Sequence, residues 1–347
     1  MNRGGFPMKK LISITLALML CLSFMVPVAL AEKAPEDYSG TVMVYTSTGE
    51  DVVLKLKAAF EAKYPNVTLD YYYAGSGKVV TKLSTEFETN AVACDIAWMA
   101  DPSAQLTWKN EGRLMAYESP FAADIDKIFK DEDNMFTAAR MVIMGISYST
   151  MTCSDEEAPY TFWDMAKEDF AGQIVMADPS NAGTTKAAVY ALVHCPDYGW
   201  KFFEDLKANG LELESSSGNT MNKVAAAAYK LCIGVDYNTK NMADQGSPIG
   251  FHNTTDVVVA CPCPIAIPAG APHPELAKLL YDWLLDPEGG QKVLANECNM
   301  TVSNPKTSIP EGMINAEEAA KVALPIDWKD MEANGADMLA QFDALFK

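Results

Sequence analysis

From Thr41 onward, short apolar runs alternate with amphipathic stretches along the chain. Residues 41–45 have the composition of a strand, and residues 51–64 place their apolar side chains on one face of a helix. Residues 67–73 form the next predicted strand, and the same alternation continues through a helix and a strand at residues 78–87 and 95–99. This pattern is typical of parallel strands joined by crossover helices, so it predicts an α/β fold.

A long apolar run after Met135 is expected to cross into a second lobe. That lobe has its own predicted strands and helices, and the chain is expected to return near residues 257–267. Neither an internal repeat nor a flexible linker is present, so strands or short hinges should join the lobes around a cleft. The predicted division is a first lobe of residues 38–143 with 262–347, and a second lobe of residues 144–261.

The N-terminal segment has the pattern of a secretory signal peptide at residues 1–31. Lys9 and Lys10 precede an apolar run, and a small-residue step at residues 29–31 follows Pro27. Cleavage is therefore expected after Ala31, which places the protein in the periplasm or on the extracellular face of the envelope. A permanent membrane anchor is the alternative, and the helix-breaking Pro27 argues against it.

Two details of this segment stay open. Cys21 follows an apolar stretch and could carry a lipid, although residues 18–20 lack the small residue expected just before a lipidated cysteine. Met8 directly precedes the two lysines, so translation could start there instead of at Met1. Neither alternative changes the predicted function.

Net charge and cysteine content exclude several classes of partner. The formal charge is −19, and it becomes −22 without residues 1–31, which disfavours nucleic acid and anionic membranes. Seven cysteines remain, scattered through apolar segments, and are expected to be buried free thiols, although a bridging pair stays open. Cys261 and Cys263 lack the spacing of a zinc clip. We expect neither a metal nor a cofactor.

Three loops combine small residues and hydroxyl groups with a following helix, which exposes backbone N–H groups to an anion. The first is residues 46–49, where Thr46 and Ser47 could face the cleft or the loop could simply cap a helix. The second is residues 74–78, with Ser76 and Gly77, which lacks the full spacing of a nucleotide-binding loop.

The third loop, residues 178–186, is the most specific of these signals, because it follows a strand, opens a helix and contains Ser180, Gly183 and Thr184. A fourth polar loop, residues 215–219, could line the cleft or be a solvated turn.

Asp236 and Tyr237 come directly after the predicted strand at residues 232–235. Because ligands of open α/β sheets bind at the carboxyl ends of the strands, Asp236 is expected to face the cleft, where it would suit a sugar hydroxyl or an amine.

Enzymatic function is disfavoured, because the sequence contains neither a nucleophile elbow nor a zinc-protease motif. Its three histidines are His194, His252 and His273, and each has a structural explanation. His252 alone is expected to be able to reach the cleft.

In this order, the segments resemble the type II periplasmic binding proteins of the branch that includes ferric-iron, hexose-phosphate and 2-aminoethylphosphonate binders. The matching pieces are residues 44–47, 95–98, 145–148, 162–164, 178–184, 234–237 and 285–289. The resemblance implies two α/β lobes of the type II fold, with strand hinges and a ligand cleft between them. It also implies a monomer that delivers a small anionic ligand to an ABC permease in the membrane.

Within this branch, the ferric binders have adjacent tyrosines where this chain has Asp236, Tyr237 and Asn238. Iron is therefore disfavoured and kept as the alternative ligand, and the tyrosines at residues 71–73 are expected to be core and surface residues.

The loops suit an oxyanion, and Lys78 or Lys186 could supply a positive charge. The expected ligand is a hexose phosphate or an aminoethylphosphonate. Its anionic head would be held by Ser76, Gly77, Ser180, Gly183 and Thr184, and the rest of the molecule would contact Asp236, Tyr237, Thr46 and Ser47.

Overall fold

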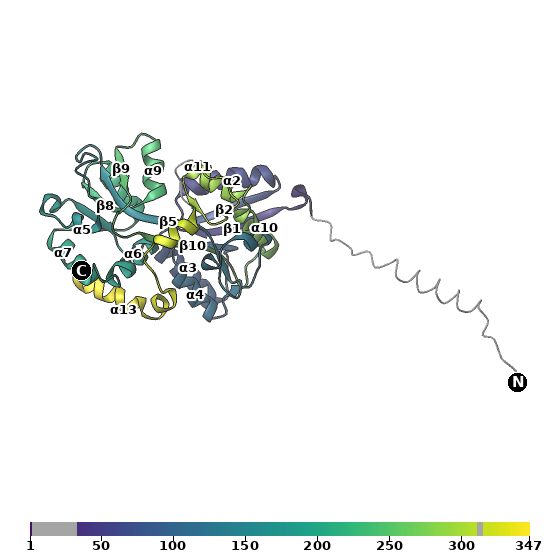
Figure 1. Ribbon diagram of the computed structural model, residues 1–347. Helices are drawn as coiled ribbons and strands as arrows, with labels where there is room; N and C mark the ends of the chain where they lie inside the picture. Colours follow the sequence, from purple (N-terminus) through teal and green to yellow (C-terminus); the bar gives the residue numbers. More distant parts are fainter. Residues whose placement is uncertain (2–32, 311–314) are drawn as a thin grey trace.

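The computed structural model describes residue 1, residues 33–310 and residues 315–347 of the chain. The predicted signal peptide beyond Met1, including Cys21, lies outside the described residues. Two α/β lobes stand side by side, and strand β5 (Phe136–Ser149) runs from one into the other (Figure 1). The expected two-lobed α/β fold is therefore confirmed.

The first lobe is built on three parallel strands, β2 (Val67–Tyr73), β1 (Gly40–Thr46) and β3 (Ile96–Trp98). Because side chains alternate across a strand, neighbouring residues of β1 pack in different cores. Val44 packs in a core with residues of α2 (Glu50–Lys63), whereas Tyr45 packs with residues of α3 (Ser76–Thr89). The lobe is completed by α4 (Pro102–Asn110), α10 (Pro274–Leu285) and α11 (Gly290–Cys298).

Strands β5 and β10 (Val259–Pro268) connect the lobes as an antiparallel pair. Every residue of β5 after Phe136 is buried. Its first half pairs with β10, and its last residues pair with β8 (Leu231–Val235) and β9 (Ile249–His252). One sheet therefore passes through both lobes in the order β2-β1-β3-β10-β5-β8-β6-β7, and the predicted strand crossing is confirmed.

The second lobe adds β6 (Ile174–Ala177) and β7 (Glu212–Glu214), both parallel to β8 in this sheet. Its helices are α6 (Gly183–Val193), α7 (Gly199–Ala208), α8 (Ser217–Ala225) and α9 (Asp236–Asp244). The shorter elements of the chain are η1 (Pro35–Asp37), β4 (Leu114–Met115), η2 (Pro120–Asp124), η3 (Lys127–Phe129), α5 (Phe162–Met165), η4 (Glu168–Phe170), β11 (Thr301–Val302) and α12 (Ala316–Val322).

The last helix, α13 (Trp328–Phe346), packs against α4 of the first lobe and against α6 and α7 of the second. On α6, the hydroxyl of Tyr190 donates to Asp330 Oδ2 at 2.6 Å. Figure 1 shows α13 running below α6 and α7, with the C-terminus beside α7. The expected lobe boundaries at residues 143 and 262 stay a prediction, and α13, expected with the first lobe, contacts both.

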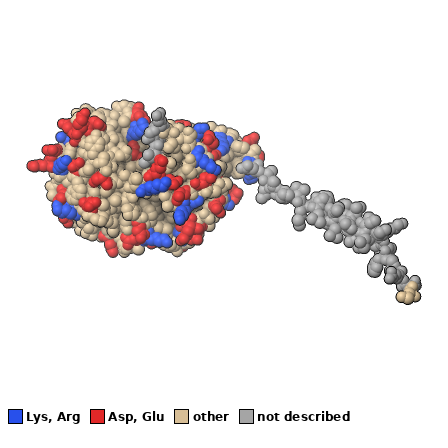
Figure 2. All heavy atoms as spheres, in the orientation of Figure 1, with Lys and Arg blue, Asp and Glu red and all other residues tan. Residues whose placement is uncertain are grey.

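The cysteines and the surface charges agree with what the composition predicted. All seven cysteines from Cys94 to Cys298 are buried and free, so the expectation of free thiols is confirmed for the described residues. Acidic and basic side chains are interspersed over the face in Figure 2, without a basic patch on that face. Within the described ranges, no helix combines the length and apolar character that crossing a bilayer requires.

Candidate functional site

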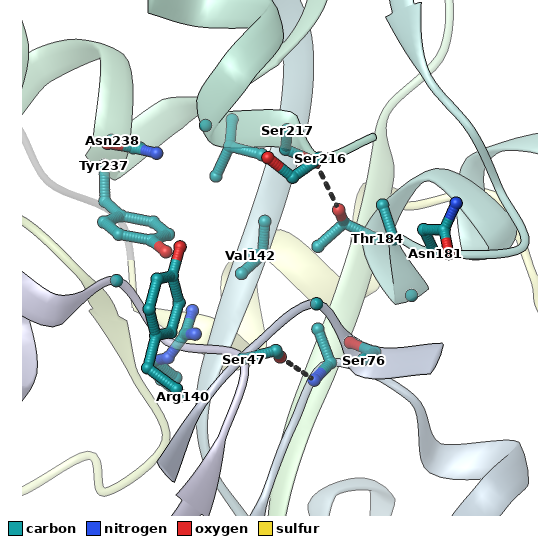
Figure 3. A pocket seen from close by; sticks show the side chains of 18 residues that line it. Ser47, Ser76, Arg140, Val142, Asn181, Thr184, Ser216, Ser217, Tyr237 and Asn238 are labelled. Carbon is teal, nitrogen blue, oxygen red and sulfur yellow. Dashed lines mark hydrogen bonds between the residues drawn. The ribbon is translucent and has the colours of Figure 1, made fainter. Parts of the chain in front are cut away.

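A cavity with about 600 Å³ of empty space, part of it open to solvent, lies where residues of both lobes meet (Figure 3). Five helices begin at its wall, and each follows a strand whose carboxyl end points to the cavity, as expected for a ligand site in an α/β sheet. The first lobe contributes the starts of α2 and α3, and the second those of α6, α8 and α9. Cavity-lining residues at these starts include Gly49, Ser76, Gly183, Ser217 and Val235.

Helix starts of this kind favour an anion, because their first N–H groups lack helical partners and the helix dipole is positive there. At α2, α3, α6 and α9, no side chain caps the helix with a hydrogen bond. Only α8 of the five has such a cap, in which Ser216 Oγ accepts from the Asn219 N–H at 3.2 Å. The wall therefore offers backbone donors from both lobes.

Arg140, on β5, lines the cavity and has only 1% of its surface exposed. Its Nη2 donates to Thr48 Oγ1 at 3.0 Å, while Nε and Nη1 have no hydrogen-bond partner among the described residues. The guanidinium lies over the rings of Trp98 and Tyr237, 5.5 and 5.0 Å from their centroids. An arginine stays protonated in proteins, so a buried positive charge with unused donors borders the cavity.

Arg140 was missed in the sequence analysis, and the charge was expected from Lys78 or Lys186 instead. Neither lysine is among the residues that line the cavity. Lys78 is exposed, and Lys186 Nζ contacts Asp101 Oδ2 at 3.2 Å and Ser103 Oγ at 2.8 Å. The available signal was the one charged residue inside an otherwise uncharged strand, because a buried charge requires a partner.

Of the residues predicted for the site, five line the cavity and four do not. Those that line it are Ser47, Ser76, Gly183, Thr184 and Tyr237. Thr46 is buried, and its Oγ1 accepts a hydrogen bond from the Thr48 N–H at 3.0 Å. This bond helps to position Thr48, the residue to which Arg140 donates.

Gly77 and Ser180 lie beside the cavity, where the two lobes touch. The Gly77 N–H donates to the Asn181 carbonyl at 3.4 Å. At Gly183, a β-carbon would come within 2.3 Å of the Ala100 carbonyl oxygen. Together with the contacts between Lys186 and Asp101, these approaches join the lobes directly. We therefore expect Gly77 and Ser180 to determine how closely the two lobes approach each other.

Asp236 faces away from the cavity. It is the first residue of α9, and its Oδ1 accepts from the Ile143 N–H at 3.3 Å. It lines a separate groove with Lys240 and Asn299. Successive residues of a helix point in directions about 100° apart. Tyr237 can therefore face the cavity although its neighbour Asp236 does not. Burial raises the pKa of Asp236 to about 7.

Tyr73 was expected to be a core or surface residue, but it lines the cavity with 42% of its surface exposed. Tyr237 lines the opposite lobe's part of the wall, and burial raises its pKa to about 12. Within the described ranges, no group of three or more His, Cys, Asp or Glu side chains could hold a metal ion.

His252 does not line the cavity, so the expectation that it could reach the ligand is not met. Its ring stacks on Tyr160 with the centroids 3.9 Å apart, and its Nε2 lies 3.0 Å from Asp155 Oδ1.

The fourth polar loop, left open by the sequence, lines the cavity through Ser216, Ser217 and Gly218. Ser217 Oγ lies 3.3 Å from Thr184 Oγ1, which joins the starts of α6 and α8 (Figure 3). Asn181 and Asn238 also line the cavity and were not predicted as site residues. Asn181 lies in the predicted loop of residues 178–186, and Asn238 directly follows Tyr237, so both are close in sequence to predicted site residues.

Comparison with known proteins gives a consistent result. The family profile described as bacterial extracellular solute-binding protein matches residues 41–296. An uncharacterized protein of Haemophilus influenzae is 24% identical over 278 residues, 75% of this chain and 77% of its own. A probable ABC transporter periplasmic-binding protein of Sinorhizobium fredii is 24% identical over 238 residues. That match covers 65% of this chain and 64% of the Sinorhizobium protein, slightly less than two thirds of its length.

Solved structures share the fold. The periplasmic binding protein AfuA of Actinobacillus pleuropneumoniae, with fructose-6-phosphate bound, has a TM-score of 0.75 and 23% identity, covering 88% of this chain and 97% of its own. An ABC transporter substrate-binding protein of Agrobacterium tumefaciens has a TM-score of 0.80 and 16% identity, covering 89% and 95%. The ferric binding protein of Campylobacter jejuni has a TM-score of 0.70 and 19% identity, covering 88% and 99%.

Proposed function

The chain belongs to the bacterial extracellular solute-binding proteins, and from this premise we propose that it captures a small phosphorylated or phosphonate organic anion for an ABC importer. Binding proteins of such importers deliver small-molecule ligands to a membrane permease. We further propose that this one is exported through its signal peptide and acts as a monomer. The expected ligands are a hexose phosphate or an aminoethylphosphonate.

The observation that carries this proposal is the position of Arg140 beneath five helix starts. Two of its nitrogens are unpartnered among the described residues, and four of the five helices lack a side-chain cap. A buried charge that is only partly paired is costly, and an oxyanion would satisfy both the guanidinium and the free N–H groups. A phosphate or phosphonate head supplies the several acceptor oxygens that this arrangement needs.

Ferric iron is the alternative, and a ferric binding protein is among the structural relatives. Tyr73 and Tyr237 are the phenols at the cavity wall. Burial raises the pKa of Tyr237 to about 12, so a ferric ion would have to displace its proton on binding. The described lining also contains no carboxylate or imidazole, and the charge of Arg140 repels a cation. These features support the anion as the ligand.

The test is a binding panel on the purified protein without residues 1–31. Native mass spectrometry first identifies any co-purified ligand. Isothermal titration calorimetry then compares glucose 6-phosphate, fructose 6-phosphate, 2-aminoethylphosphonate and ferric citrate. We expect saturable one-to-one binding of a phosphorylated or phosphonate compound, without turnover when the recovered ligand is assayed. Binding of ferric citrate alone would assign the protein to iron, and turnover of the ligand would indicate an enzyme.

A further inference from the structure

We propose that the cavity selects an anion whose remaining groups are neutral, and that it discriminates against ligands carrying an ammonium group. This inference rests on the proposed function and narrows its ligand class. Arg140 is the one side chain with a formal charge among the described residues that line the cavity. The wall therefore offers a counter-charge for an anionic head but none for a cation.

Three carboxylates near the site are already occupied or face elsewhere. A fourth, Asp51, lies beside the lining residue Gly49 at the start of α2 but does not itself line the cavity. Asp236 lines the separate groove and accepts from the Ile143 N–H. Asp101 is held by Ser103, whose Oγ donates at 2.6 Å, and by Lys186. Asp178 accepts from the Ser180 N–H at 2.9 Å and pairs with Lys347 at 2.9 Å. A ligand ammonium would thus lose its water without gaining an anionic partner among the residues that line the cavity.

The rings of Tyr73 and Tyr237 line the cavity and could in principle receive a cation. Tyr237 already has the Arg140 guanidinium over its ring, and the exposed Tyr73 shares the cavity with the same positive charge. The positive ends of five helices surround the same space. A second positive charge would therefore be repelled by Arg140 and by the helix dipoles together. The electrostatics of the wall favour anions throughout and disfavour zwitterions.

The remaining polar groups of the wall are hydroxyls and amides, which suit neutral hydroxyl groups of a ligand. They come from both lobes and are Ser47, Ser76, Asn181, Thr184, Ser216 and Asn238. Some are already oriented, because the Ser47 hydroxyl oxygen accepts from the Ala100 N–H at 3.4 Å and Thr184 lies beside Ser217. A phosphorylated polyol or sugar matches this set better than an aminophosphonate does.

Two matched ligand pairs test this inference by calorimetry at pH 6, where the amines are protonated. Glucosamine 6-phosphate differs from glucose 6-phosphate by an amine in place of one hydroxyl. 2-Aminoethylphosphonate differs from ethylphosphonate by its amine. In the pair that binds, we expect the ligand without the amine to bind at least about tenfold more tightly. In the glucosamine pair, the difference should narrow as the pH is raised and the amine loses its proton.

The outcomes separate this inference from the proposed function. If an amine-bearing ligand binds as tightly as its neutral partner, or more tightly, the inference is overturned while the phosphate-binding function stands. If none of the four compounds binds but ferric citrate or an unphosphorylated solute does, the proposed ligand class itself has failed. A tenfold preference that does not change with pH would mean that shape causes it, which would also overturn the inference.

Discussion

A β-carbon on Gly77 would lie 2.3 Å from the backbone carbonyl oxygen of Ser180, so the two lobes approach each other here as closely as a glycine permits. Gly77 belongs to α3 of the first lobe, and Ser180 belongs to the loop before α6 of the second. Neither residue lines the cavity. The contact between them therefore concerns how the lobes meet around a ligand.

Gly77→Ala should weaken ligand binding by about tenfold or more without unfolding the protein. The methyl group would collide with backbone that cannot rotate away, so the lobes would be held apart. Calorimetry gives the affinity, and small-angle X-ray scattering shows whether the ligand still compacts the protein. Lys78→Ala, on the neighbouring exposed residue, is the control. Normal affinity and compaction in Gly77→Ala would show that this approach is not needed for binding.

Arg140→Met should reduce affinity by about 100-fold or more, because charge-assisted hydrogen bonds contribute roughly 1.5 to 3 kcal/mol each. The unliganded protein should keep its melting temperature, since a buried, partly unpaired charge is replaced by an apolar side chain of similar length. Calorimetry and thermal unfolding measure the two effects. Arg113→Met, an arginine away from the cavity, should leave affinity unchanged. Tight binding by Arg140→Met would exclude Arg140 as the anion partner.

Thr184→Val removes one hydroxyl while keeping the shape of the side chain. If that hydroxyl bonds to the ligand, affinity should fall by roughly tenfold. The matched control is Thr85→Val, on the exposed side of α3. An unchanged dissociation constant, measured by calorimetry, would remove Thr184 from the binding residues.

Asp236→Asn should change the pH dependence of stability and leave affinity unaltered. Burial raises the pKa of Asp236 from 3.8 to about 7, so the folded state holds this proton more tightly than the unfolded state. Its contribution to stability is present below pH 4 and is lost as the pH rises to about 7. Asparagine mimics the protonated acid, so the variant should be more stable than the wild type at pH 8 and similar at pH 4.

Thermal unfolding at both pH values measures this difference, and Asp244→Asn on the same helix is the control. A parallel loss of affinity in Asp236→Asn would return Asp236 to the binding site.

Much of the architecture could be predicted because the relevant interactions are local. The strand at residues 67–73 begins and ends where expected, and the helix expected at residues 51–64 is α2, Glu50–Lys63. Periodicity and the proline that follows the helix act within a few residues. The loops that open α3 and α6 were also found, and the cavity brings Ser76 and Thr184 together. The order of strands and helices was enough to place these loops at the same edge of the sheet.

The sequence by itself determined the α/β alternation, the crossing strand and the polar loops, because each follows from neighbours along the chain. Only the tertiary structure decided that Arg140 borders the cavity, that Asp236 turns away from it and that two backbones approach closely at Gly77. These outcomes depend on the direction of a side chain at the end of an element and on contacts between distant segments. Burial and long-range packing determine the side-chain directions and the distant contacts. Hydrophobic periodicity along the chain carries no information about either.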